Sequence, residues 1–194
     1  GPYAAAMAAH ARWWLGGAAF ACAVVVATWV SSTVALPVTN ISPVFLPLGL
    51  GVAVLARWGR SLWPAFVLGD VVGQLVAGER LPTWIALSLA CHLATVLIGA
   101  TLIQRQRAWI DGLGSAARYL AITAGLAVLG AALGIVGLKV HGFLAGSEEA
   151  LTTFAFWALG DFGGYLVLGA AVIVWSGPGA IRELRRPLGW AMVL

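Results

Sequence analysis

The sequence predicts an all-α fold, a polytopic transmembrane helix bundle with about six complete helices and the start of a seventh. Composition is the first reason, because 61% of the 194 residues are hydrophobic and only 9% are charged. A soluble domain carries about a quarter charged residues. The second reason is the length of the apolar runs, which approach the roughly 20 residues that a membrane helix needs. These runs are continuous and rich in Ala, Leu and Gly, which favours helices over the alternating strands of a barrel.

Six apolar runs are long enough to predict membrane helices. They cover residues 13–36, 41–57, 61–78, 81–103, 117–140 and 151–175. A seventh run begins at Leu188 and is still too short to cross at Leu194. We therefore expect residues 7–194 to form one transmembrane domain that is cut at its C-terminal end. Residues 1–6 begin with Gly-Pro, which is typical of a protease scar, and we expect them to be disordered.

Lysine and arginine are distributed unevenly between the loops, and this bias predicts the orientation in the membrane. With the N-terminus in the cytoplasm, the inner loops hold Arg12, Arg57, Arg60, Arg105, Arg107, Arg118, Arg182, Arg185 and Arg186. The outer loops then hold only Arg80 and Lys139. The net charge of +4 does not indicate nucleic-acid binding, because these residues form no basic stripe.

The second run differs from the others because it contains Pro43, Pro47, Gly49 and Gly51. Proline removes a backbone donor and kinks a helix. The favoured interpretation is a simple proline-kinked helix. The alternative is an unwound stretch whose free carbonyls face a binding cavity, since broken helices at membrane depth occur only where protein or a cavity surrounds them.

Four strongly polar side chains lie deep in the apolar runs, namely Asp70, Gln74, His92 and Asp161. Ionisable groups near the bilayer midplane cost about 3 kcal/mol or more, so they face the bundle interior and partner one another. Ser88 and Thr95 share the helical face of His92. We expect Asp70, His92 and Asp161 to meet around one polar pocket. Two interpretations stay open, a structural cluster that fixes helix register and a ligand, proton or metal site.

Both aspartates occur in the pattern LGDxxG. Each copy contains a GxxxG spacing, from Gly69 to Gly73 and from Gly160 to Gly164, and this spacing lets helix backbones approach closely. The two copies are consistent with an inverted three-plus-three repeat, although six residues are too few to establish one. We expect these four glycines to serve helix packing, as does Pro47.

No motif indicates catalysis or a defined cofactor. The sequence contains no nucleophile elbow, phosphate loop or HExxH pattern. Cys22 and Cys91 lie within apolar runs and lack metal-type spacing. His10 and His141 lie too far from the middle of the runs to share a haem with His92. We expect no enzymatic activity, and the presence of a metal or cofactor stays open.

Two stretches, Phe45 to Gly78 and Phe156 to Trp175, resemble the first type of the bacterial membrane-associated sensor domains (the MASE series). The matching positions are Pro47, Arg57, Arg60, Pro64, Gly69, Trp157, Gly160, Asp161 and Gly164. The chain departs from the family pattern at Leu46, where tryptophan is usual, and at Gly169, where proline is usual. The resemblance implies an N-terminal input domain of about eight helices in the bacterial inner membrane. It also implies a cytoplasmic output in the same full-length chain, such as a histidine kinase or a diguanylate cyclase.

The main functional hypothesis is therefore a sensory membrane module that binds a small ligand or a partner membrane protein near the midplane. Binding would shift helix packing, which requires different affinities for two states. The alternative is a transporter or channel that uses the Asp/His cluster as its permeation site. The partners that follow from this hypothesis are the lipid bilayer, the ligand or partner membrane protein, and the cytoplasmic output domain, with a homodimer as an open alternative.

Cysteine labelling tests the predicted orientation. Cysteines introduced at positions 80 and 145 should react with an impermeant thiol reagent added from outside, because both positions lie in outer loops. Cysteines at positions 60 and 110 should react only after the membrane is opened. Outside labelling at 60 or 110 would overturn the topology.

Overall fold

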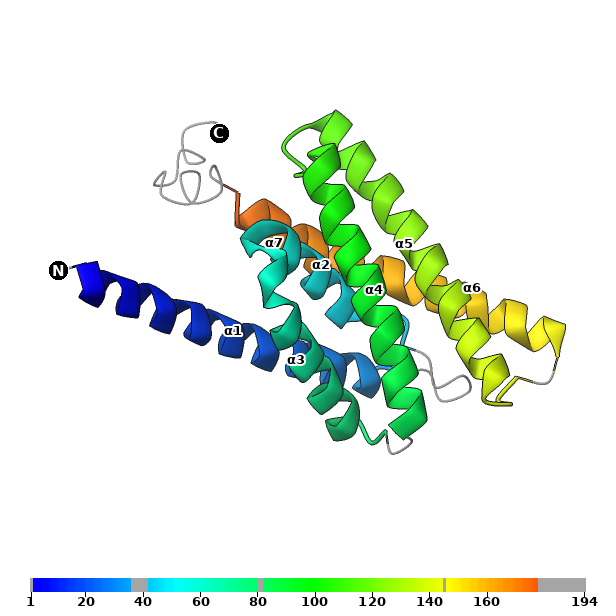
Figure 1. Cartoon of the computed structure of the whole chain (residues 1–194). Coiled ribbons are helices and arrows are strands. Elements are labelled where there is room, and N and C mark those ends of the chain that lie inside the picture. The colour runs from blue at the N-terminus through cyan, green and yellow to red at the C-terminus, as the bar shows by residue number, and fades with distance from the viewer. Residues whose placement is uncertain (1, 36–41, 80–81, 145, 178–194) are drawn as a thin grey trace, which may run out of the picture.

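A computed structural model describes residues 2–35, 42–79, 82–144 and 146–177, and over these ranges the chain is helical with no strand. The helices are α1 (Pro2–Thr33), α2 (Leu46–Trp58), α3 (Trp63–Val76), α4 (Pro82–Gln106), α5 (Leu113–Val140), α6 (Ser147–Gly164) and α7 (Ala170–Trp175). A 3₁₀ turn, η1 (Arg60–Leu62), precedes α3, and a π-helical segment, η2 (Tyr165–Gly169), joins α6 to α7. Figure 1 shows these helices packed as one bundle, beyond which the N-terminal half of α1 projects.

The predicted fold class is confirmed, because the described helices match the six apolar runs in order. Within the described residues, four segments are long and apolar enough to cross a membrane, namely Trp13–Thr33, Pro82–Gln106, Leu113–Val140 and Ser147–Trp175. The other two runs form the shorter helices α2 and α3, of 13 and 14 residues. The chain is a multi-pass membrane protein, and six complete crossings stay a prediction.

Helices α1 and α3 run side by side in the same direction. A Cβ on Gly69 would lie 2.6 Å from the carbonyl oxygen of Ala21, and a Cβ on Gly73 would lie 2.6 Å from Cβ of Thr28. Only glycine permits such a close approach. The first LGDxxG copy therefore faces α1, and Asp70, between its two glycines, is held in the interior with no exposed surface.

Helix α2 is the centre of the bundle, because every residue from Pro47 to Ala56 is buried. It packs against α1, α4, α6, η2 and α7. Figure 1 shows it enclosed between α4 and the α6–α7 arm. Its start lies beside the middle of α4, where the ring of Phe45 contacts that of His92. At its end, the Ala56 carbonyl accepts a hydrogen bond from Gln104 near the end of α4. Helix α2 therefore fills only one half of the depth of the bundle.

The favoured interpretation of the second run was wrong, because this run is not one kinked helix. Residues 42–45 are not helical, and Pro47 lies in the first turn of α2, where its missing N–H is no loss. The alternative was correct that the chain is unwound. However, the carbonyl of Ser42 meets Gly160 and that of Phe45 meets Gly164. These two glycines of the second LGDxxG copy therefore admit a non-helical stretch of backbone, not a second helix.

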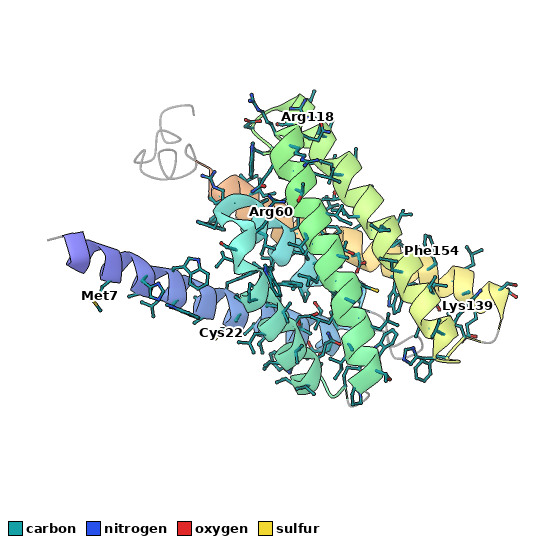
Figure 2. The ribbon with its side chains drawn as sticks, in the orientation of Figure 1. Met7, Cys22, Arg60, Arg118, Lys139 and Phe154 are labelled. Carbon is teal, nitrogen blue, oxygen red and sulfur yellow. The ribbon has the colours of Figure 1, made fainter. Side chains whose placement is uncertain are left out.

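Helix α5 packs against both α4 and α6. Figure 2 shows Arg118 and Lys139 at opposite ends of α5, so these two basic side chains lie at opposite ends of the bundle.

The two ends of the chain compare differently with the prediction. Helix α1 begins at Pro2, within the segment 1–6 that we expected to be disordered. The start of the seventh run at Leu188 lies outside the described residues.

The contact between α6 and the non-helical backbone gives a stability prediction. Gly164→Ala should lower the free energy of unfolding by about 2 kcal/mol or more, because the new methyl group would overlap the Phe45 carbonyl and backbone cannot move aside cheaply. The control is Gly125→Ala on α5, where a Cβ meets nothing within 4 Å. That variant should be neutral or more stable by about 0.5–1 kcal/mol. Thermal melting in detergent measures both, and equal melting of the two variants would contradict the packing described.

Candidate functional site

The described part of the bundle contains a cavity of about 420 Å³ at one end. The lining comes from the last turns of α1 and α3, the first part of α4, the second half of α5, and Trp157 and Asp161 in the second half of α6. Phe45 and Leu48, at the start of α2, also contribute to the wall. The opposite half of the bundle, where α2 is buried, contributes no lining residue beyond Leu48.

A chain of polar side chains connects α3 to α4 along this cavity. Ser88 donates a hydrogen bond to Gln74 Oε1 (2.8 Å), and Gln74 Nε2 donates to Asp70 Oδ2 (3.2 Å). The same carboxylate oxygen lies 2.9 Å from His92 Nδ1. Four side chains from the sequence prediction are therefore brought together. Thr95 lies one turn further along α4, where its hydroxyl donates to the Cys91 carbonyl.

Asp70 is removed from the cavity as well as from lipid. Its side chain has no exposed surface, and its second oxygen, Oδ1, has no hydrogen-bond partner among the described residues. Burying a carboxylate is costly unless a partner offsets the charge. His92 and Gln74 both approach Oδ2, so the charge of Asp70 has partners within the protein at that oxygen. Because the whole side chain is buried, Asp70 is a poor candidate for direct ligand contact.

Asp161 is placed differently, although it belongs to the same sequence pattern. It lines the cavity, is partly exposed to it, and lies close enough to His92 to interact electrostatically. None of the described residues donates a hydrogen bond to its carboxylate. Its Oδ2 occupies the space that a side chain at Gly130 would fill, 2.8 Å from the position of that Cβ. Asp161 therefore presents a carboxylate to the cavity.

Aromatic rings form the mouth of the cavity around Asp161. Trp157 lies one turn before Asp161 on α6 and stacks on Trp84 of α4, with ring centroids 6.3 Å apart and an interplanar angle of 25°. Gly134 on α5 leaves room for the Trp157 ring, which a Cβ at that position would overlap. Glycines of α5 therefore admit both the carboxylate and the indole of α6.

The helix beyond Asp161 changes its hydrogen bonding in η2. The Tyr165 carbonyl accepts the N–H of Ala170, five residues on, and also the hydroxyl of Tyr119 on α5 (2.7 Å). The Tyr165 hydroxyl is buried, lies in electrostatic range of Asp161, and has no hydrogen-bond partner among the described residues. Single π-helical turns inside α-helices are frequent at functional sites.

Several residues of this site were not predicted from the sequence. Trp157 was counted only as a family motif position, and Thr28, Phe45, Tyr119 and Tyr165 were not singled out. The spacing of Asp161 and Tyr165, one turn apart on one face, was the signal that could have identified the tyrosine. Among the described residues, no group of three His, Cys, Asp or Glu side chains converges closely enough to hold a metal ion.

Comparison with known proteins relates the sequence to a family. The sequence model of the MASE1 family matches residues 14–190. The chain is also 23% identical over 133 residues to the probable diguanylate cyclase DgcE of Escherichia coli (strain K12). That match covers 67% of this chain and 12% of the relative, so the chain corresponds to a small part of that protein. No solved structure matches the chain significantly.

The two tyrosines near the π-helical segment give a matched test of its hydrogen bond. Tyr119→Phe removes the donor to the Tyr165 carbonyl and should lower the free energy of unfolding by about 1–2 kcal/mol. Tyr165→Phe removes a hydroxyl that has no described partner, and should change stability by less than about 0.5 kcal/mol. Thermal melting in detergent compares them, and a larger loss for Tyr165→Phe would contradict the assignment.

Proposed function

Because this chain belongs to the MASE1 family of membrane sensory input domains, we propose that it is a receptor without catalysis of its own, whose cavity binds a small ligand. The family match confirms the resemblance based on the motifs around Pro47 and Asp161. Binding would control a cytoplasmic output domain in the same full-length chain, such as a diguanylate cyclase or a histidine kinase. The observation that carries the proposal is the carboxylate of Asp161, which faces the cavity without an internal donor among the described residues.

The shape of the cavity favours a receptor over a transporter or channel. Every helix that lines it contributes residues from the same end of the bundle. Below Leu48, residues Gly49–Ala56 of α2 are buried among the surrounding helices. A permeation pathway needs a route past the site toward the other face, whereas a ligand pocket needs only one opening.

The charge distribution supports an orientation in the bacterial inner membrane with the cavity open to the outside. Arg57 and Arg60 lie at the end of α2 and the start of α3, and Arg105 lies in the last turn of α4. This is the end of the bundle away from the cavity. Basic residues concentrate on the cytoplasmic side. The ligand would therefore enter from outside while the output lies inside.

The α6–α7 arm offers a route from the cavity to the cytoplasmic end. Asp161 is followed after one turn by η2, which contacts α2, and α7 follows directly. At its end, the Ser176 carbonyl accepts a hydrogen bond from Arg57 of α2 (2.7 Å). A ligand shifts such an arm only if it binds the two arrangements with different affinity. The π-helical segment is the element that would provide those arrangements, by changing between π-helical (i to i+5) and α-helical (i to i+4) hydrogen bonding.

Substitution of Asp161 in the full-length gene product tests the proposal. Asp161→Asn keeps the shape and should insert and accumulate like the parent, but should change the output activity several-fold. Asp161→Leu and Asp161→Lys should accumulate poorly, because Leu removes the carboxylate that interacts electrostatically with His92 and Lys places a cation near the midplane. Immunoblots of membranes and an assay of the output reaction provide the two measurements.

The control is Glu148→Gln, which removes an exposed carboxylate from the first turn of the same helix. It should leave both abundance and output near the parental values. If Asp161→Leu proved as abundant and as responsive as the parent, the assignment of Asp161 to a ligand-binding site would be wrong.

A further inference from the structure

We propose that the ligand of this cavity is a small organic cation, with an amine head that pairs with Asp161 and an apolar or aromatic body. The inference rests on the proposed function, because it names the chemical class of ligand for that cavity. Two features carry it: the negative, acceptor-only carboxylate of Asp161 and the aromatic wall beside it.

The charge of the cavity is negative. Its described lining includes the carboxylate of Asp161 but no lysine or arginine. The one basic side chain in that lining, His92, has its Nδ1 engaged by the buried carboxylate of Asp70. His92 reaches Asp161 electrostatically but forms no hydrogen bond with it, so the oxygens of Asp161 stay open to a ligand. A carboxylate in a low-dielectric site attracts a cation strongly.

The walls next to Asp161 suit a cation with an apolar body. Trp157 lies on the same face of α6 as Asp161, and Trp84 stacks against it. The negative face of an indole ring attracts an ammonium group, and the ring covers apolar surface at the same time. An anionic ligand would meet Asp161 with like charge and would find no arginine or lysine in the described wall.

The hydrogen-bonding capacity of Asp161 also favours an amine. An ionised carboxylate only accepts hydrogen bonds, whereas an ammonium head carries N–H donors and no acceptor. Such a head can therefore donate to Asp161, whereas a carboxylate ligand cannot bind it in this way.

The alternative of a bare metal ion fits the site less well. Among the described residues, no three metal-ligating side chains converge. Protein metal sites usually supply three or four such ligands. The volume of about 420 Å³ is also within the range of pockets that enclose a small organic molecule.

Three probes of one shape and different charge test the inference on the purified chain in nanodiscs. Isothermal titration calorimetry is run with benzylamine, benzyl alcohol and benzoate, which are cationic, neutral and anionic at pH 7. Benzylamine should bind saturably and at least about 10-fold more tightly than benzyl alcohol, which corresponds to about 1.4 kcal/mol. Benzoate should not bind. This comparison uses the unsubstituted protein and does not depend on the folding of a variant.

Two variants locate the site. Asp161→Asn should weaken benzylamine binding at least about 10-fold while benzyl alcohol binding persists, which shows that the cavity is intact. Glu148→Gln should leave the affinity for benzylamine unchanged.

Equal affinities for benzylamine and benzyl alcohol, or unchanged benzylamine binding by Asp161→Asn, would overturn the inference. An absence of saturable benzylamine binding would do the same. A preference for benzoate would reject the cation class and leave a receptor cavity in place, whereas failure of the proposed function would appear as output that ignores Asp161.

Discussion

The hydrogen bond from the Phe45 N–H to the Gly160 carbonyl (2.8 Å) is the contact on which the arrangement of this bundle depends. Inside a membrane protein every backbone polar group needs a partner, because no water is available in the apolar region. Residues 42–45 are not helical, and within this segment the Ser42 hydroxyl bonds both the N–H and the carbonyl of Val44, which leaves the N–H of Phe45 to find a partner elsewhere. They lie against α6 at Gly160 and Gly164, and the Leu46 N–H is taken up by the hydroxyl of Ser31 on α1 (3.0 Å). These contacts fix where α2 starts, and the start of α2 closes the cavity.

The two copies of LGDxxG show how one sequence pattern serves two environments. In the first copy, Gly69 and Gly73 bring α3 against α1, and Asp70 is enclosed by His92 and Gln74. In the second copy, Gly160 and Gly164 admit a non-helical backbone, and Asp161 is left facing open space above Gly130. The residue one turn later differs too, because Gln74 donates to its aspartate whereas Tyr165 finds no described partner. Neighbouring helices decide the role of each carboxylate.

Much of the fold could be predicted from the sequence, because apolar run length and loop charge are properties of the chain itself. The polar face of α4 could be predicted for the same reason, since Ser88, His92 and Thr95 are fixed by helical spacing. The start of α2 could not, because it depends on tertiary partners for Phe45 and Leu46 that no local pattern records. Tyr119 and Trp157 escaped prediction for a related reason. Each acts through a contact with a helix or segment elsewhere in the chain, and an isolated aromatic residue resembles any other core or interface residue.

The π-helical segment Tyr165–Gly169 holds one more residue in its turn than an α-helix would. Each α-helical residue turns the helix by about 100°, so one additional residue changes the facing of everything that follows by that angle. In the arrangement described, Ile173 is buried at 2% exposure while Val174 is 43% exposed. If the segment were wound as regular α-helix, the neighbours of Ile173 would turn toward α2 in its place. A local change of winding in the π-helical segment, beside the cavity, would therefore rotate helix α7 about its own axis.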